Sequence, residues 1–206
     1  MVMQPEFLFD FASPNAYLAH KVIPQIEART GAKFTYTPVL LGGVFKLTGN
    51  QAPMIAFGNI RNKMDYEMLE TRRFIARHRL NAFRMNPHFP VNTLLLMRIA
   101  AGAEIDGGLA PYMEVAYRHM WELGSNMSDP EVVRAALNEG GLDAELLMAR
   151  AQAQDAKDRL MANTSDAVER GAFGIPTFVV GTEIFFGKNT LREVEEEIVA
   201  QKRLHP

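Results

Sequence analysis

The sequence predicts an α/β fold in which a small mixed sheet is interrupted by a large all-helical insertion. Three observations predict it: a strand–helix–strand pattern at the start, a long middle with helical signals only, and a hairpin and helix at the end. A chain of 206 residues can bury a large core and lies between one domain and two. We therefore expect a discontinuous domain at residues 1–45 and 165–206, with a helical domain inserted at residues 46–164.

The first segment contains a strand, a helix and a second strand. An apolar run rich in phenylalanine stops at Ser13-Pro14, where Ser13 fits the N-cap and Pro14 the first helical position. Apolar residues then recur at helical spacing to about Arg29, with a kink expected at Pro24. Residues 33–39 alternate as a strand does, and right-handed crossover logic makes the two strands parallel.

The middle of the chain is predicted to form a loop followed by helices. Residues 40–53 contain glycines and a closing proline, which predict a loop with one helical turn at most. Residues 54–78 predict one helix, and the two prolines at residues 84–92 exclude another. Asn92 or Thr93 can cap the next helix, and Ser128 begins a capping-box pattern. The further helices are expected at residues 94–103, 109–123, 128–140, 143–153 and 155–170.

The final segment returns to β-structure. Residues 177–180 and 184–186 are apolar runs around a Gly-containing turn, which is typical of a hairpin, and a terminal helix follows. Pro176 opens the first of these runs, and a central strand rarely tolerates a proline.

Composition limits the function classes. The chain contains no cysteine, so any thiol chemistry must come from a bound small molecule. A net charge of -2 with scattered basic residues gives no case for nucleic acid, and the five histidines lack metal-ligand spacing. No apolar stretch is long enough to cross a membrane and no leader pattern is evident, so we expect a cytoplasmic protein.

Ser13 is the first candidate site residue. Its hydroxyl would lie at a positive helix end, where an anion such as a thiolate or a carboxylate is favoured, although an N-cap role alone is an adequate alternative. Ser13-Pro-Asn-Ala16 resembles the Cys-Pro-x-Cys site of thioredoxin-fold oxidoreductases without its sulfurs. In such proteins a proline like Pro176 is cis and exposes the backbone of the preceding residue, here Ile175, to a peptide-like ligand. These patterns specify the fold as thioredoxin-like.

Five segments carry a closer resemblance. They are residues 9–17, 41–50, 86–93, 171–178 and 185–189, in order along nearly the whole chain. Together they are similar to the 2-hydroxychromene-2-carboxylate isomerases, which are related to kappa-class glutathione transferases and to DsbA.

The resemblance implies that glutathione is the cofactor. Ser13 would contact its sulfur, Ile175 beside Pro176 would pair with its cysteinyl backbone, and Asn50 would reach another part of the tripeptide. Turn formation alone can also explain Asn50.

Two adjacent positions depart from the family. An Asp-Arg pair usually holds the γ-glutamyl end, and here Asn189 and Thr190 stand in its place. Losing both charges weakens the case for glutathione, because a charge-assisted hydrogen bond contributes about 1.5–3 kcal/mol. Lys188 can compensate at the α-carboxylate, and Asn189 can accept from the α-ammonium group.

The implied activity is the interconversion of 2-hydroxychromene-2-carboxylate and trans-o-hydroxybenzylidenepyruvate in aromatic compound catabolism, by a homodimer. Lys46, Arg84 and Asn92 are candidates for binding this substrate, and surface ion pairs explain the two cations equally well. Two alternatives stay open: a kappa-like glutathione transferase or dehalogenase, and a non-catalytic binding protein that has lost glutathione.

Overall fold

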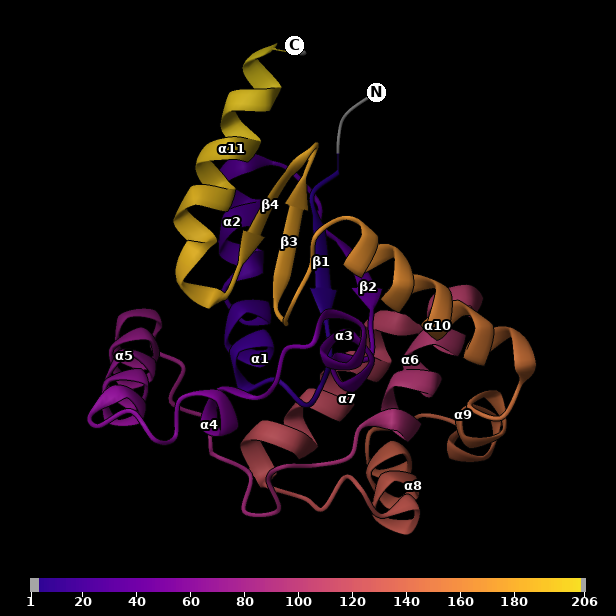
Figure 1. Ribbon diagram of the computed structural model, residues 1–206. Coiled ribbons are helices and arrows are strands. Elements are labelled where there is room, and N and C mark those ends of the chain that lie inside the picture. The colour runs from indigo at the N-terminus through magenta and orange to yellow at the C-terminus, as the bar shows by residue number, and fades with distance from the viewer. Residues whose placement is uncertain (1–3, 205–206) are drawn as a thin grey trace.

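The computed structural model describes residues 4–204 and confirms the predicted thioredoxin-like α/β fold with a helical insertion (Figure 1). Its sheet has the strand order β2-β1-β3-β4. Strand β1 (Glu6–Phe9) runs parallel to β2 (Thr35–Pro38) and antiparallel to β3 (Thr177–Val180). Strand β4 (Glu183–Phe186) completes the hairpin with β3, as the sequence predicted.

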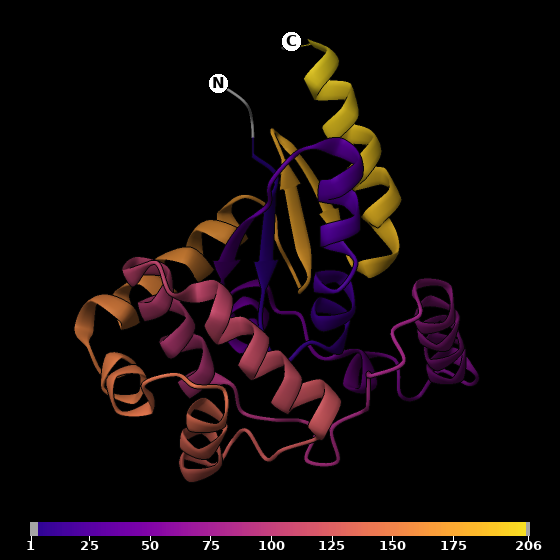
Figure 2. The same cartoon turned by 180° about the vertical axis from the view of Figure 1, so that it is seen from behind.

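The helix expected after β1 is two helices. Helix α1 (Pro14–His20) ends before α2 (Ile23–Thr30) begins, so the expected single kinked helix is wrong. Pro24 lies in the first turn of α2, where a residue without an N–H needs no helical partner. Figure 2 shows α1 and α2 running beside the strands, with α11 (Leu191–Leu204) packed against α2.

The insertion consists of helices that pack beside β2 and around α1. They are α3 (Leu41–Thr48), α4 (Pro53–Ala56), α5 (Lys63–His78), α6 (Leu94–Asp106), α7 (Leu109–Arg118) with a π-helical turn (His119–Leu123), α8 (Pro130–Glu139), α9 (Ala144–Arg150) and α10 (Gln154–Glu169). Helices α6 and α10 pack on each other and on β2. The proposed division at residues 45/46 and 164/165 falls within α3 and within α10. No helix among residues 4–204 is long and apolar enough to cross a membrane.

Three local expectations are wrong for identifiable reasons. Residues 41–48 form the helix α3 rather than a loop, and Gly43 lets it approach α10, since a Cβ there would lie 3.0 Å from Cγ2 of Thr164. Residues 54–78 are split into α4 and α5 by a turn in which Asn62 adopts a left-handed φ of 68°. The cap of α8 is Asp129 rather than Ser128, because the Asp129 carboxylate accepts the Glu131 N–H at 2.9 Å.

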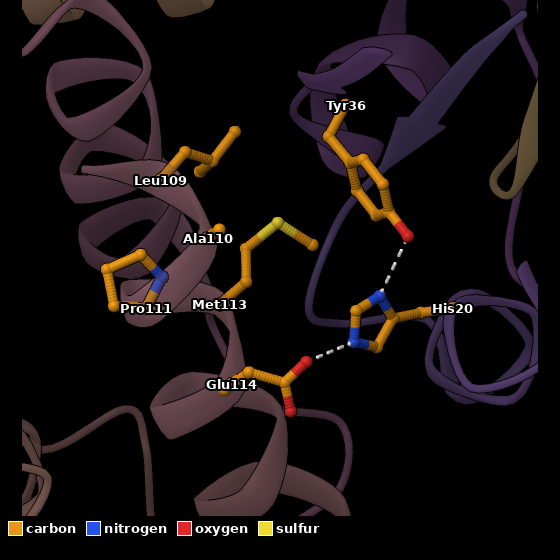
Figure 3. Close-up of a pocket in the computed structure, with 7 residues that line it drawn as sticks. All are labelled: His20, Tyr36, Leu109, Ala110, Pro111, Met113 and Glu114. Atoms are coloured by element: carbon orange, nitrogen blue, oxygen red, sulfur yellow. Dashed lines mark hydrogen bonds and ion pairs between the residues drawn. The ribbon is translucent and has the colours of Figure 1, made fainter. Parts of the chain in front are cut away.

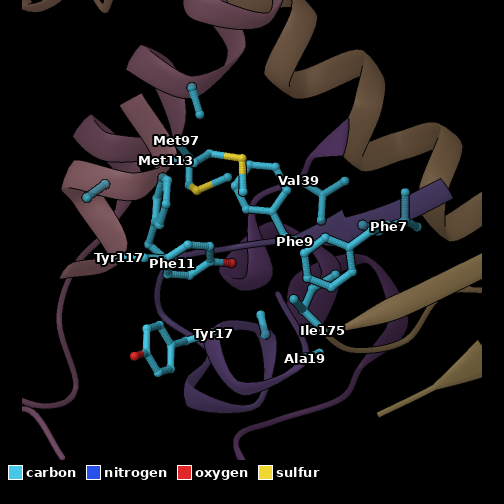
Figure 4. Packing of buried hydrophobic residues seen from close by; sticks show 14 of the residues in the cluster. Phe7, Phe9, Phe11, Tyr17, Ala19, Val39, Met97, Met113, Tyr117 and Ile175 are labelled. Atoms are coloured by element: carbon cyan, nitrogen blue, oxygen red, sulfur yellow. The ribbon is translucent and has the colours of Figure 1, made fainter. Parts of the chain in front are cut away.

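An aromatic core fixes the end of β1. Phe7, Phe9 and Phe11 are fully buried, and the Phe11 ring meets Tyr117 of α7 edge-on with centroids 4.8 Å apart (Figure 4). The indole Nε1 of Trp121 donates to the Phe11 carbonyl at 2.9 Å. Because side chains from the sheet and the insertion both hold this segment, the turn that leads to Ser13 has little freedom.

Candidate active site

Ser13 lies at the junction of β1 and α1, and its hydroxyl joins two distant parts of the chain. Ser13 is 3% exposed, and its Oγ donates to the carbonyl oxygen of Ile175 at 3.0 Å. The same oxygen accepts the Ala16 N–H at 3.2 Å, so the predicted N-cap is confirmed. The Ile175–Pro176 peptide is cis, also as predicted.

The backbone of Ile175 is suited to pairing with an extended ligand. Its carbonyl receives the Ser13 hydroxyl, while within residues 4–204 its N–H forms no hydrogen bond. A peptide-like ligand in antiparallel register needs one N–H donor and one carbonyl acceptor from the same residue. Ile175 offers both once the Ser13 hydroxyl rotates toward the ligand.

An exposed aromatic pair flanks this backbone. The rings of Phe173 and Phe186 are 48% and 44% exposed and their centroids lie 4.5 Å apart. A Cβ at Gly174 would lie 2.7 Å from Cε2 of Phe186, so a larger residue here would displace that exposed ring. Asn50 reaches the same loop, since its Nδ2 donates to the Phe173 carbonyl at 2.7 Å. The sequence reasoning missed the pair, although both phenylalanines stand in segments that resemble the family.

The segment after β4 carries a buried lysine. Lys188 begins a 3-10 turn (Lys188–Thr190) that packs against α1. The Lys188 side chain is buried, its Nζ lies 5.7 Å from the centre of the Phe74 ring of α5, and burial lowers the pKa of its amine. Within residues 4–204 this amine forms no ion pair. The Thr190 hydroxyl donates to the Gly187 carbonyl at 2.9 Å, whereas Asn189 is exposed.

Asp10 is a buried carboxylate that accepts several hydrogen bonds, and the sequence did not predict this role. Its Oδ1 accepts the Ala12 N–H at 2.8 Å and the Thr93 hydroxyl at 2.7 Å, and its Oδ2 accepts the Leu41 N–H at 2.7 Å. Burial raises the pKa of the Asp10 carboxyl, although these hydrogen bonds oppose the change. One carboxylate therefore joins the end of β1 to the first residues of α3 and α6, next to the Ser13 turn. An acid directly after a buried strand was the available signal.

The three candidate substrate ligands lie in different places. Lys46 is exposed in the last turn of α3. Nη1 of Arg84 donates to the carbonyls of Asn81 and Phe83 at 2.7 and 2.8 Å, and Oδ1 of Asn92 accepts the Leu94 N–H at 3.0 Å. Within residues 4–204 none of the three hydrogen-bonds to Ser13.

A cleft lies at the C-terminal end of α1 (Figure 3). Its volume is about 440 Å³, and it is lined by His20, Tyr36, Leu109, Ala110, Pro111, Met113 and Glu114. His20 places Nδ1 at 3.2 Å from the Tyr36 hydroxyl and Nε2 at 2.9 Å from Oε1 of Glu114. The hydrogen bond from His20, helped by Lys21, lowers the pKa of Glu114 to about 2. Both ring nitrogens are thus engaged by the protein, and α1 separates this cleft from Ser13.

Across residues 4–204, no three His, Asp or Glu side chains gather as a potential ion site.

Comparison with known proteins places this geometry among its relatives. The family model described as a DSBA-like thioredoxin domain matches residues 6–199. The 2-hydroxychromene-2-carboxylate isomerase of Sphingobium xenophagum is 24% identical, over 94% of this chain and 97% of its own. The enzyme of the same name from Pseudomonas putida is 27% identical over 92% of this chain and 91% of its own. Human glutathione S-transferase kappa 1 is 23% identical over 98% of this chain and 92% of its own.

Solved structures agree with these sequence matches. A 2-hydroxychromene-2-carboxylate isomerase structure superposes with a TM-score of 0.76 at 25% identity, covering 98% of this chain and 96% of that one. A probable DsbA oxidoreductase from Streptomyces coelicolor gives a TM-score of 0.73 at 19% identity, covering 99% of this chain and 91% of that one. At this identity the match supports the fold alone.

Proposed function

This chain belongs to the DSBA-like thioredoxin domain family, and from that premise we propose that it is a glutathione-dependent isomerase of aromatic 2-oxo acids. The proposed reaction interconverts 2-hydroxychromene-2-carboxylate and trans-o-hydroxybenzylidenepyruvate, by analogy with the named activity of its relatives. The isomerase and transferase names of those relatives support an enzyme, and the reaction, the cofactor and the substrate are our proposal.

The hydrogen bond between Ser13 and Ile175 carries the proposal. The Ser13 hydroxyl lies 3.0 Å from the Ile175 carbonyl, beside a cis-proline. The chain itself has no cysteine, so a thiol at this place must arrive with a ligand. A cysteine-containing peptide would set its backbone against Ile175 and its sulfur near Ser13.

The residues around Ser13 fit glutathione in four respects. The hydroxyl can turn from the Ile175 carbonyl to donate to an anionic sulfur, and the freed carbonyl and the N–H of Ile175 can pair with a cysteinyl backbone. The buried Lys188 amine would have to turn from the Phe74 ring to bind a ligand carboxylate, and Asn189, whose side chain forms no hydrogen bond within residues 4–204, would accept from an ammonium group. Thr190 does not fit the family's arginine role, because its hydroxyl already caps the Gly187 carbonyl. Bound glutathione would supply the nucleophilic thiolate that adds to and later leaves a conjugated carbon of the substrate.

The protein would also orient the substrate. The exposed rings of Phe173 and Phe186 offer an aromatic surface beside Ile175. Lys46 lies on the same α3 segment that leads to Asn50, and its ammonium is our first candidate for the substrate carboxylate. Arg84 would have to leave the carbonyls that its Nη1 now contacts, and Asn92 would have to leave its capping bond.

A kappa-like glutathione transferase is the second candidate, favoured by the 23% identity to the human enzyme over 98% of this chain. The two reactions differ in stoichiometry, since an isomerase returns glutathione and a transferase consumes it. Measuring free thiol during turnover separates them. A cytoplasmic location and a homodimer are also proposed.

The Ser13→Ala variant tests the proposal. We expect it to fold but to lose one to several orders of magnitude in kcat, because the lost hydrogen bond matters most when the sulfur is anionic. The lost cap alone should lower the free energy of unfolding by about 0.5–2 kcal/mol. Ser128→Ala, an exposed serine before α8 that does not cap it, is the matched control. An unchanged kcat at saturating substrate in Ser13→Ala would exclude the thiolate role.

A further inference from the structure

The cleft beside α7 has the size and the lining of a small-molecule site. Its volume of about 440 Å³ lies within the range of roughly 300–1,000 Å³ that such sites occupy. Most of its lining is apolar and comes from α7, where Leu109 and Met113 point toward Tyr36 and His20 on the opposite wall (Figure 3). The polar groups are His20, the Tyr36 hydroxyl and Glu114. An apolar pocket with a few polar groups on one side selects its ligand through those groups.

The hydrogen bonds of these polar groups determine what they offer a ligand. Glu114 stays ionised at neutral pH because the hydrogen bond from His20 lowers its pKa to about 2. Its carboxylate can only accept, so Nε2 of neutral His20 carries the proton and donates to Oε1 of Glu114 at 2.9 Å. Nδ1 of His20 is then an acceptor, and the Tyr36 hydroxyl donates to it at 3.2 Å. What is left for a ligand is the lone pairs of the Tyr36 and Glu114 oxygens, and these are acceptors.

The charge around Glu114 favours a cation. Lys21 donates to Oε2 of Glu114 at 3.0 Å, and the same Nζ lies 3.7 Å from Oε1 of Glu122. One ammonium therefore serves two carboxylates, and with neutral His20 the group carries one net negative charge. The Glu114 side chain is 60% exposed, so a ligand can reach its oxygens. A ligand carboxylate would meet acceptors and net negative charge here, whereas an ammonium would meet two acceptors of the right kind.

We propose that this cleft binds a small ammonium compound with an apolar body, such as a primary arylalkylamine. Its ammonium donates to the Glu114 carboxylate, and its apolar body packs between Leu109 and Met113 of α7 and the ring of Tyr36. Ser13 and His20 are seven positions apart, which puts roughly 10 Å of helix between the two sites. This inference does not depend on the glutathione proposal.

Amide chemical-shift titrations of the whole chain test the site with three probes of similar shape. 2-Phenylethylammonium should bind saturably and shift the amides of residues 109–114 and of His20. 2-Phenylethanol keeps the shape without the charge, so it should bind about tenfold more weakly. 3-Phenylpropanoate should leave these amides unshifted, because it presents a carboxylate to Glu114.

Two variants test the charge and the space separately. Glu114→Gln keeps the side-chain shape and removes the charge, so its affinity for 2-phenylethylammonium should fall about tenfold while its affinity for 2-phenylethanol stays the same. Ala110→Trp, at an exposed lining residue in the first turn of α7, should fill the cleft and abolish binding of both probes.

Glu139→Gln is the matched control. Glu139 also lies near a histidine and a basic residue, with Oε2 at 3.8 Å from Nε2 of His119 and Oε1 at 3.6 Å from Nη1 of Arg118, but it does not line the cleft. This variant should bind 2-phenylethylammonium as the parent does. Melting temperatures confirm that each variant is folded, and the exposed Glu114→Gln change decides the matter if Ala110→Trp does not fold.

Three outcomes would overturn the proposal. The first is a parent protein without saturable shifts at about 10 mM 2-phenylethylammonium. The second is an alcohol or carboxylate probe that binds as tightly as the ammonium, and the third is a folded Glu114→Gln or Ala110→Trp variant that binds it as tightly as the parent. Repeating the parent titration with glutathione present should give the same dissociation constant, so the two proposals stand or fall separately.

Discussion

Replacing Asp10 by asparagine should destabilise the protein through one hydrogen bond. The buried carboxylate accepts from three donors, the Ala12 N–H, the Thr93 hydroxyl and the Leu41 N–H. An amide oxygen in the Oδ1 position can keep the first two, but the amide nitrogen then faces the Leu41 N–H. Leaving the Leu41 donor unpaired against a buried amide costs about 1–3 kcal/mol in the free energy of unfolding.

Urea unfolding and calorimetry measure this cost. For a chain of this length each kcal/mol lowers Tm by roughly 2–4 °C, so Asp10→Asn should melt roughly 2–12 °C below the parent. Asp158→Asn is the matched control, because within residues 4–204 that exposed carboxylate accepts a single hydrogen bond, from Gln154 at 2.8 Å. It should change the free energy of unfolding by less than about 0.5 kcal/mol. An Asp10→Asn variant as stable as the parent would refute the view that this carboxylate ties the Ser13 turn to the insertion.

Three further outcomes are expected. Ser13→Cys should not reduce insulin at thioredoxin-like rates, because the chain has no second thiol to resolve a mixed disulfide. Glu114, whose pKa is lowered to about 2 by His20, stabilises the fold above its unfolded pKa, and this stability is lost as pH falls from about 4.5 to about 2. Glu114→Gln should therefore make the free energy of unfolding less dependent on pH in that window. It should cost about 1 kcal/mol or less at neutral pH. Asn189→Asp with Thr190→Arg should tighten glutathione binding by more than the sum of the single changes, as calorimetry would show; a double variant that binds no better than the parent would point to a ligand without a γ-glutamyl group.

The parts of the fold that follow short-range rules could be predicted from sequence. The Ser13 cap, the hairpin after Pro176 and the parallel pairing of β1 with β2 each depend on local residue patterns or on chain handedness. The cis bond before Pro176 came from the family resemblance and is also present.

Tertiary contacts explain what the sequence could not show. The glycines predicted a loop around Gly43, but Gly43 lies in helix α3. This helix packs so closely on Thr164 that a residue without a side chain is favoured at that position. Asp10 follows β1 directly, and its role is visible only in the folded chain, where Thr93 and Leu41, which are distant in sequence, donate hydrogen bonds to it. All the ligand-binding roles remain predictions: those of Ser13, Asn50, Ile175, Pro176, Lys188 and Asn189 toward glutathione, and those of Lys46, Arg84 and Asn92 toward the substrate.

Glutathione binding by Ser13 and Ile175 is tested most directly by calorimetric titration of the parent and of Ser13→Ala with reduced glutathione. We predict saturable binding of one glutathione per chain to the parent, and weaker binding to the variant at alkaline pH, where more of the ligand is thiolate. The absence of any saturable heat in the parent at millimolar glutathione would contradict the account and would favour a protein that kept the fold and lost the cofactor.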